Sequence, residues 1–133
     1  MELREGEYLV SDDKSLLQLP VICGFLARSY WANGRPEEAT RQAIEHSVCY
    51  GLYRGGVQIG FARVVTDGAT VYYLCDVYID EDERGKGLGK MLVGAIVREY
   101  ERIPGFLGTR DAHGLYEQYG FRRDAERFMR RAP

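Results

Sequence analysis

The chain has 133 residues, of which 45% are hydrophobic and 29% charged, as is typical of one soluble globular domain spanning residues 1–133. Its formal net charge of −2 argues against nucleic acid as a partner, because nucleic-acid-binding domains present a net basic face. The longest apolar run, Val21–Ala27, is too short to cross a bilayer, so no membrane partner is expected.

Hydrophobic periodicity and turn residues divide the chain into helices and strands. Apolar residues recur at helical spacing in three segments, and three strand-like segments are separated by glycine-containing turns. The expected elements, in chain order, are a strand at 8–10, helices at about 20–29 and 36–47, strands at 48–53, 57–65 and 71–79, a helix at about 89–103, a strand at 106–109, a helix at 111–119 and an extended segment from 121.

This order predicts an α+β fold, an α/β/α sandwich with a mixed, mostly antiparallel central sheet. The second helix is expected to bury Ala39, Ala43 and Ile44. The strand at 71–79 is apolar enough to be central in its sheet. The strand at 106–109 would run parallel to it through a right-handed helical crossover.

The three cysteines, Cys23, Cys49 and Cys75, have neither the spacing of a metal site nor the even count of a disulfide framework. They predict free thiols in a reducing compartment and no bound metal. Residues 1–5 carry three charged side chains, which is not typical of a signal peptide. These features together predict a cytoplasmic protein.

The segment at 75–90 indicates a buried strand, an acidic turn, a glycine-rich loop and the start of a helix. Gly85, Gly87 and Gly89 leave the main chain without Cβ atoms, so that N–H groups can approach a phosphate. The helix adds free N–H donors and the positive end of its dipole. Full positive charges come from Arg84, Lys86 and Lys90. The segment therefore predicts an anion site at a helix N-terminus.

Spacing separates three kinds of phosphate loop. A mononucleotide P-loop would need a glycine at Arg84 and a hydroxyl at Met91, and a dinucleotide fingerprint would need a glycine at Lys90. The third pattern, [RQ]-x-x-G-x-[GA] after a strand, is matched by the segment from Arg84 to Gly89. This segment resembles the acyl-coenzyme A loop of the GCN5-related N-acetyltransferase (GNAT) family. A glycine-rich turn with solvated charges is the alternative that the loop alone leaves open.

A second segment, from Thr109 to Phe121, resembles the N-x-x-A-x-x-L-Y-x-x-x-G-F segment of the same family. Five positions match in register: Ala112, Leu115, Tyr116, Gly120 and Phe121. Thr109 stands at the asparagine position and departs from the pattern. The connection at 101–106 is short for the family, so the strand that follows it is expected to be reduced. The order of elements follows the family over nearly the whole chain.

The resemblance implies a GNAT fold and the transfer of an acetyl group from acetyl-CoA, a co-substrate used without a metal, to a primary amine by direct attack. In the family, main-chain N–H groups of the strand at 77–79 polarise the thioester. Tyr116 matches the general acid that protonates the leaving thiolate. The residues assigned to acetyl-CoA are Val77, Tyr78, Ile79, Arg84, Gly85, Lys86, Gly87, Leu88, Gly89, Lys90, Thr109 and Ala112.

The acceptor side is less defined. A lysine-like amine has a pKa of about 10.4, which is about 3.4 units above pH 7, so deprotonating it at pH 7 costs about 4.6 kcal/mol. A base is therefore expected. Asp76 is the first candidate because it interrupts an apolar strand, and a structural carboxylate is its alternative role. By analogy with the family, Tyr30 and Trp31 are expected to line the acceptor pocket, although the same pair suits a core corner.

The acceptor is expected to be a small-molecule or peptide amine. A non-catalytic acyl-CoA-binding or sensor domain on the same fold stays open as the alternative function. A homodimer also stays open, since dimers are the commonest oligomers.

Overall fold

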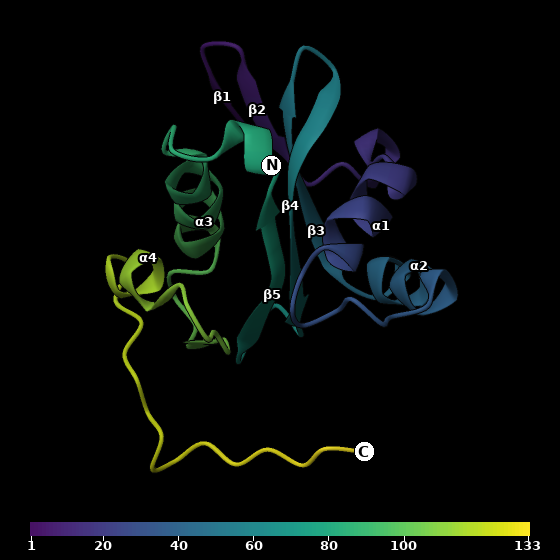
Figure 1. Ribbon diagram of the computed structural model, residues 1–133. Helices are drawn as coiled ribbons and strands as arrows, with labels where there is room; N and C mark the ends of the chain where they lie inside the picture. The colour runs from purple at the N-terminus through teal and green to yellow at the C-terminus, as the bar shows by residue number, and fades with distance from the viewer.

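The computed structural model describes residues 1–133 and holds a six-stranded sheet between two pairs of helices (Figure 1). Helices α1 and α2 cover one face, and α3 and α4 cover the other. The strands are β1 Glu2–Glu5, β2 Tyr8–Ser11, β3 Val48–Arg54, β4 Val57–Thr66, β5 Tyr72–Ile79 and β6 Gly105–Phe106, and the helices are α1 Leu19–Ala27, α2 Glu37–Glu45, α3 Leu88–Glu99 and α4 His113–Glu117, with short 3₁₀ helices at Lys14–Leu16 and Glu81–Glu83.

The strands lie in sequence order from β1 to β6, and every neighbouring pair is antiparallel except β5 and β6. The expected α+β sandwich with a mixed, mostly antiparallel sheet is therefore confirmed. The parallel pairing of β5 with β6 is also as expected, and β6 is reduced to two residues.

Strand β5 lies next to the edge of the sheet, so the expectation that it is central was wrong. Its side chains are nevertheless apolar, because α3 packs on one face of the strand and α1 on the other. Hydropathy reports whether the faces of a strand are covered and gives no information on whether its main-chain edges are paired. Only Tyr72 and Tyr73 of β5 have a partner in β6.

Three further details differ from the sequence expectations. The N-terminal strand β1 was missed because its residues are mostly exposed and polar, as is common on an edge strand. Helix α2 buries Thr40, while Ala43 and Ile44 are half-buried and Ala39 is exposed, so its inner stripe is rotated by one residue. The segment after Phe121 forms no strand and runs away from α4 (Figure 1).

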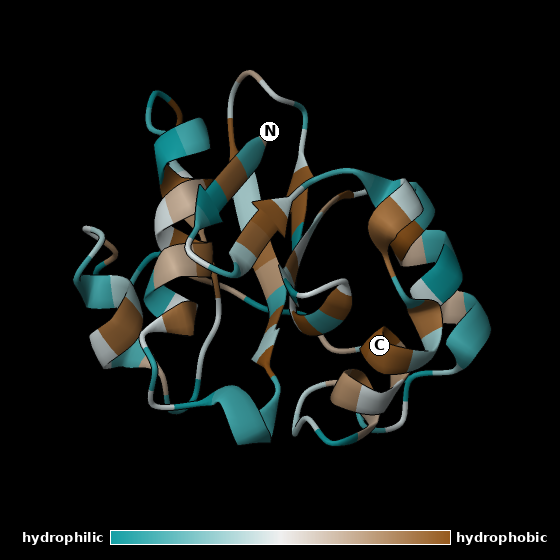
Figure 2. Cartoon of the chain, turned by 90° about the horizontal axis from the view of Figure 1, so that it is seen from above, coloured by the Kyte–Doolittle hydropathy of each residue, from teal (hydrophilic) through white to brown (hydrophobic).

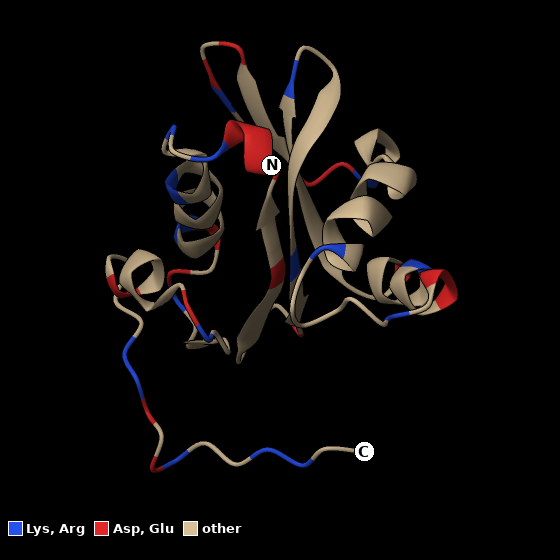
Figure 3. Ribbon diagram, viewed as in Figure 1, with Lys and Arg blue, Asp and Glu red and all other residues tan.

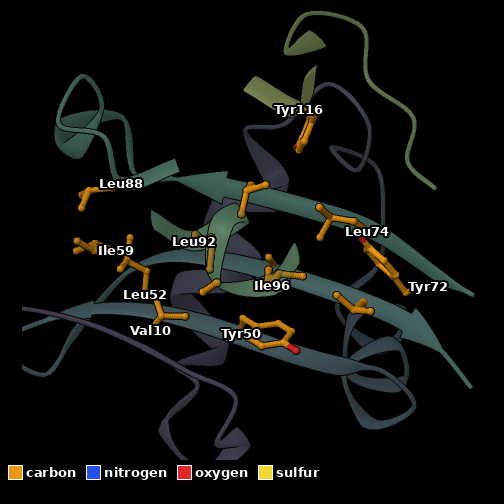
Figure 4. Packing of buried hydrophobic residues seen from close by; sticks show 14 residues of the cluster. Val10, Tyr50, Leu52, Ile59, Tyr72, Leu74, Leu88, Leu92, Ile96 and Tyr116 are labelled. Atoms are coloured by element: carbon orange, nitrogen blue, oxygen red, sulfur yellow. The ribbon is translucent and has the colours of Figure 1, made fainter. Parts of the chain in front are cut away.

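The larger hydrophobic core lies between the sheet and α3. It contains 14 buried residues, and Figure 4 shows Leu92 and Ile96 of α3 above Leu52 and Tyr50 of β3. A second cluster of seven buried residues lies under α1. The colouring of Figure 2 shows hydrophobic residues concentrated in the strands and in the helices beside them. No helix combines the length and the apolar character that crossing a membrane requires.

Replacing Leu92 by alanine should lower the free energy of unfolding by about 2–5 kcal/mol, because the side chain is fully buried and its removal leaves a cavity. Urea unfolding measures this change. Met129→Ala is the matched control, since Met129 is 93% exposed, and it should change the same quantity by less than about 0.5 kcal/mol. Equal effects of the two variants would contradict the position of the core.

Candidate active site

The connection from β5 to α3 exposes its main chain. Gly85 and Gly87 have φ angles of +81° and +78°, and Gly87 is the N-cap of α3 in a left-handed conformation. Such angles favour glycine over other residues. A Cβ atom at either position would meet no heavy atom within 4 Å, so both glycines border open space. The loop thus has the form that the glycine spacing predicted.

The first turn of α3 adds donors to this loop. The first i to i−4 hydrogen bond of the helix runs from the Met91 N–H to the Gly87 carbonyl oxygen, at 3.1 Å. The N–H groups of Leu88, Gly89 and Lys90 precede it and have no acceptor within the helix. These donors, the helix dipole and the bare loop fit a bound diphosphate.

The three cations of the loop differ in what they contact. Arg84 donates from Nε to the Ile79 carbonyl oxygen at 3.0 Å, and its guanidinium lies 5.0 Å from the ring centre of Tyr78. Lys86 pairs with Glu83 at 2.8 Å, so a carboxylate already neutralises the lysine charge. Lys90 has no ion pair and its residue borders a separate groove beside α3. Figure 3 shows the acidic turn that precedes these basic residues.

The edge of β5 that faces away from β4 is free along its last residues. The Asp80 N–H bonds to the carbonyl oxygen of Ile59 in β4, at 2.8 Å. Because main-chain directions alternate along a strand, the N–H groups of Val77 and Ile79 point to the opposite edge. No strand lies there, since β6 reaches only Tyr73. The side chain of Tyr78 instead stacks on Phe25 of α1, with ring centres 5.0 Å apart.

Asp76 sits at a bulge in β5. The pairing with β4 shifts register between Phe61 and Arg63, and Asp76 is the only non-glycine residue with a positive φ, +55°. Its carboxylate is 4% exposed and accepts hydrogen bonds from Trp31 Nε1 at 3.0 Å, from Arg35 at 2.8 and 3.3 Å, and from Arg63 Nε at 2.9 Å. Three side chains, two from the connection between α1 and α2 and one from β4, thus hold the bulge in place.

These contacts favour the structural role of Asp76 over that of a base. Burial raises the pKa of Asp76, but the hydrogen bonds and charges of Arg35 and Arg63 outweigh it, so that the net pKa is lowered. A carboxylate with a lowered pKa binds a proton weakly. Four donor atoms also surround its two oxygens, which leaves little room for a substrate amine.

Tyr116 of α4 is buried, and its ring lies edge-on to Phe121, with centres 6.1 Å apart. Burial raises the pKa of Tyr116 to about 12, and its hydroxyl has no hydrogen-bond partner within the chain. The helix begins after its N-cap Ala112, whose N–H bonds to Thr109 Oγ1 at 3.0 Å. Tyr116 therefore presents a protonated, unpaired hydroxyl.

Tyr30 and Trp31 lie in the connection between α1 and α2, and both are exposed. The Tyr30 hydroxyl accepts a hydrogen bond from the Arg110 N–H at 2.9 Å, and the Arg110 guanidinium lies 3.9 Å from the Tyr30 ring centre. The loop before α4 is thus tied to the loop after α1, which lies on the other face of the sheet.

One groove of about 1360 Å³ brings most of these residues together. It runs past the free edge of β5, from the glycine loop to the Tyr30–Trp31 segment. The predicted site residues that line it are Tyr30, Trp31, Asp76, Val77, Tyr78, Ile79, Arg84, Gly85, Gly87, Leu88, Gly89, Thr109, Ala112 and Tyr116. The predicted residues Lys86 and Lys90 do not line it.

Sequence reasoning missed Arg35, Arg63 and Arg110, which also line the groove. Arg35 and Arg63 have no motif around them, and Arg110 stands at a variable position of the 109–121 segment, so no local signal pointed to any of the three. The cysteines form no disulfide, and no cluster of three or more His, Cys, Asp or Glu side chains is placed to hold a metal ion.

Comparisons with known proteins agree with this architecture. The sequence profile of the acetyltransferase (GNAT) domain matches residues 45–123. The crystal structure of a candidate acetyltransferase of the GNAT family from Xanthomonas campestris pv. campestris is 36% identical, with a TM-score of 0.90 over 98% of this chain and 96% of that chain. The overall fold of the chain is thus shared with a candidate acetyltransferase of the GNAT family. The chain belongs to the GNAT acetyltransferase family.

Two further proteins resemble the chain, one in sequence and one in fold. A candidate acetyltransferase of Gibberella zeae is 36% identical over 108 residues, which are 66% of this chain and 61% of that protein. The chain therefore spans about three fifths of the length of that relative. An aminoglycoside N-acetyltransferase, AAC(6')-Iy, solved in complex with CoA, shares the fold at 18% identity, with a TM-score of 0.71 over 97% of each chain.

Replacing Asp76 by asparagine should lower the free energy of unfolding by about 3 kcal/mol at pH 7, because two guanidiniums lose their buried counter-charge. The pKa of Asp76 in the folded state lies below its value of about 3.9 in the unfolded state. The ionised carboxylate therefore adds to the free energy of unfolding above about pH 3.9, and this stabilisation is lost as the pH falls through the folded-state pKa. The difference between wild type and variant should therefore shrink below about pH 4, as urea unfolding at several pH values would measure.

Asp111→Asn is the control for this variant, because Asp111 also lines the groove but has no ion pair. It should change stability by less than about 0.5 kcal/mol at either pH. If Asp76→Asn left stability unchanged and abolished turnover, the catalytic role of Asp76 would regain support.

Proposed function

We propose that the chain transfers the acetyl group of acetyl-CoA to a primary amine of a small molecule or peptide. The observation that carries the proposal is the single groove in which free main-chain donors and an unpaired tyrosine hydroxyl meet. The donors are the N–H groups of Val77 and Ile79 on the edge of β5 and those of the first turn of α3. The hydroxyl is that of Tyr116.

Main-chain groups would hold the co-substrate. The N–H groups of Leu88, Gly89 and Lys90, together with the bare glycine loop, would bind its diphosphate. Arg84, which lines the same groove, adds one positive charge. The N–H groups of Val77 and Ile79 would bind the pantetheine amide and the thioester oxygen, where negative charge develops. When bound, acetyl-CoA supplies the acyl group and a thiolate as leaving group.

The acceptor amine must be neutral before it attacks. Asp76 is not the base in this proposal, because Arg35, Arg63 and Trp31 already occupy its oxygens. Arg110 lines the groove without an ion pair, and a nearby guanidinium disfavours an ammonium ion and so lowers the pKa of a bound amine. A guanidinium at about 6 Å and an effective dielectric of about 20 would contribute about 2.8 kcal/mol, more than half of the cost of deprotonating a lysine-like amine.

Tyr116 would donate to the leaving thiolate. With a pKa raised to about 12 by burial, the phenol stays protonated throughout the range in which proteins are usually assayed. Its hydroxyl makes no hydrogen bond inside the chain, so it is available to a ligand. A purely acyl-CoA-binding or sensor domain has no use for such a donor, which favours the enzymatic function over that alternative.

Acetyl-CoA should raise the melting temperature of the protein, whereas ATP and NAD at equal concentration should not. A ligand at about 100 times its Kd adds about 2.7 kcal/mol to the stability of the folded state. Gly87→Ala should weaken the effect of acetyl-CoA, because a φ of +78° is unfavourable for alanine and the loop would shift. Gly55→Ala, in the β3–β4 turn at a φ of +58°, is the control for backbone strain alone. Stabilisation by ATP alone would overturn the proposal.

Tyr116→Phe should lower kcat by about 10²-fold, because general-acid catalysis contributes about 10²–10⁴. The Kd for CoA should stay near wild type, since the phenyl ring is kept. Tyr119→Phe is the matched control: its hydroxyl bonds to the Lys90 carbonyl oxygen and does not line the groove. Single-turnover kinetics would separate the two variants. Unchanged chemistry in Tyr116→Phe would remove the residue from the mechanism.

A further inference from the structure

The groove carries more positive than negative charge, although the chain as a whole has a formal net charge of −2. The positive residues that line it are Arg28, Arg35, Arg63, Arg84, Arg110 and Arg130. The negative residues that line it are Asp76, Glu81, Glu83 and Asp111. Ion pairs decide which of these charges remain available to a ligand.

The carboxylates near the glycine loop are already neutralised. Glu81 pairs with Arg28 at 2.7 Å, and Glu83 pairs with Arg54 at 2.6 Å and with Lys86 at 2.8 Å. Asp111 is the one carboxylate of the groove without an ion pair. Negative charge is therefore scarce along the whole groove.

The other end of the groove holds unmatched arginines. Asp76 is shared by Arg35 and Arg63, so one carboxylate faces two guanidiniums. Their side chains remain 24% and 14% exposed. Each guanidinium has five N–H donors. Arg35 Nε and Arg63 Nη2 bond to no other group of the chain, and these donors remain for a ligand.

Arg110 adds a third charge at this end. It makes no ion pair and is held over the Tyr30 ring, with its own N–H bonded to the Tyr30 hydroxyl. The contacts with Tyr30 thus fix the position of Arg110, while no carboxylate neutralises its charge.

This cationic end is distinct from the phosphate loop. Arg63 pairs across the strands with Cys75, which lies four residues before Ile79. At about 3.3 Å per residue, the two positions are roughly 13 Å apart along β5. One phosphate group cannot contact both.

An apolar surface lies beside the arginines. Val65 of β4 and Tyr73 of β5 pair directly across the strands, on the face of the sheet that also carries Arg63. They are 46% and 38% exposed and line the groove. A ligand at this end would therefore meet cationic donors and an apolar floor together.

We propose that the acceptor is a primary amine with a carboxylate next to the amine and an apolar side group, as in an amino acid with a large hydrophobic side chain. The carboxylate would bind the free donors of Arg35 and Arg63 and be attracted by the unpaired charge of Arg110 in the same groove, and the side group would rest on Val65 and Tyr73. The inference rests on the proposed function, because the amine of such a ligand must reach the thioester. Polyamines and aminoglycosides, which carry several positive charges, would be repelled.

The reaction balances for this acceptor. The amine nitrogen forms a bond to the acyl carbon, and the carbon–sulfur bond of the thioester breaks. The thiolate takes a proton from Tyr116, and the nitrogen loses a proton, which restores the phenol through solvent. The products are an N-acetyl amino acid and free CoA.

Binding to the wild-type chain tests the acceptor class without needing turnover. Calorimetry on the protein saturated with CoA would compare phenylalanine, phenylalaninamide and spermidine. Phenylalanine should bind at least tenfold more tightly than its amide, which keeps the amine and the side group but lacks the negative charge, and spermidine should bind most weakly. Equal or stronger binding of the amide or of spermidine, or no binding of phenylalanine, would overturn the proposal.

Substitutions then locate the carboxylate site. Arg35→Gln and Arg110→Gln should each raise the Kd for phenylalanine at least fivefold and change that for phenylalaninamide less than twofold. Arg41→Gln is the matched control, since this exposed arginine of α2 pairs only with Glu37 outside the groove. Thermal melts would check that each variant is folded. Equal losses for both ligands, or no loss, would refute the assignment.

Release of free thiol from acetyl-CoA separates this inference from the function on which it rests. Tight binding of phenylalanine without thiol release would contradict the proposed transferase but keep the carboxylate site. If thiol release were as fast with the amide as with phenylalanine, the proposed acetyl transfer would stand, and the proposal that the acceptor carries a carboxylate would be refuted.

Discussion

The structure depends on one break in main-chain pairing. Strand β5 loses its parallel neighbour after Tyr73, because β6 has only two residues, and a bulge at Asp76 shifts its register with β4. The N–H groups of Val77 and Ile79 therefore have no strand to bond to. An unpaired strand edge inside a sheet is normally unfavourable. Here it forms one wall of the groove, next to the first turn of α3, so that two rows of free donors meet.

The bulge is held by charge. Asp76 has a backbone conformation that few non-glycine residues adopt, and its carboxylate is held by Arg35, Arg63 and Trp31. The same ion pairs have a second effect, because two guanidiniums share one carboxylate and one positive charge stays unmatched. A contact that stabilises the main chain thus also sets the sign of the potential at one end of the groove. The glycine loop, by contrast, offers mainly main-chain donors, since Glu83 neutralises Lys86.

Most of the fold followed from the sequence, and the exceptions have physical causes. The helices, the β3–β4–β5 meander and the parallel β6 were expected, because periodicity and turn residues act between near neighbours. Strand β1 was missed because an exposed edge strand has no hydrophobic alternation. The predicted position of β5 in the sheet was wrong, because the burial of side chains on both faces of a strand does not depend on how many of its main-chain edges are paired. The predicted buried face of α2 was off by one residue, because Thr40 is buried and Ala39 is exposed.

By itself the sequence determined the local parts of the candidate site: a glycine loop before α3, a tyrosine on α4 and the family to which the chain belongs. Each of these lies within a run of a few residues, so the sequence order preserves its geometry. Only the tertiary structure decided what Asp76 contacts and which arginines remain free. The partners of that carboxylate lie 13, 41 and 45 residues away in the chain, and charge balance in a groove depends on distances in space that local spacing does not encode.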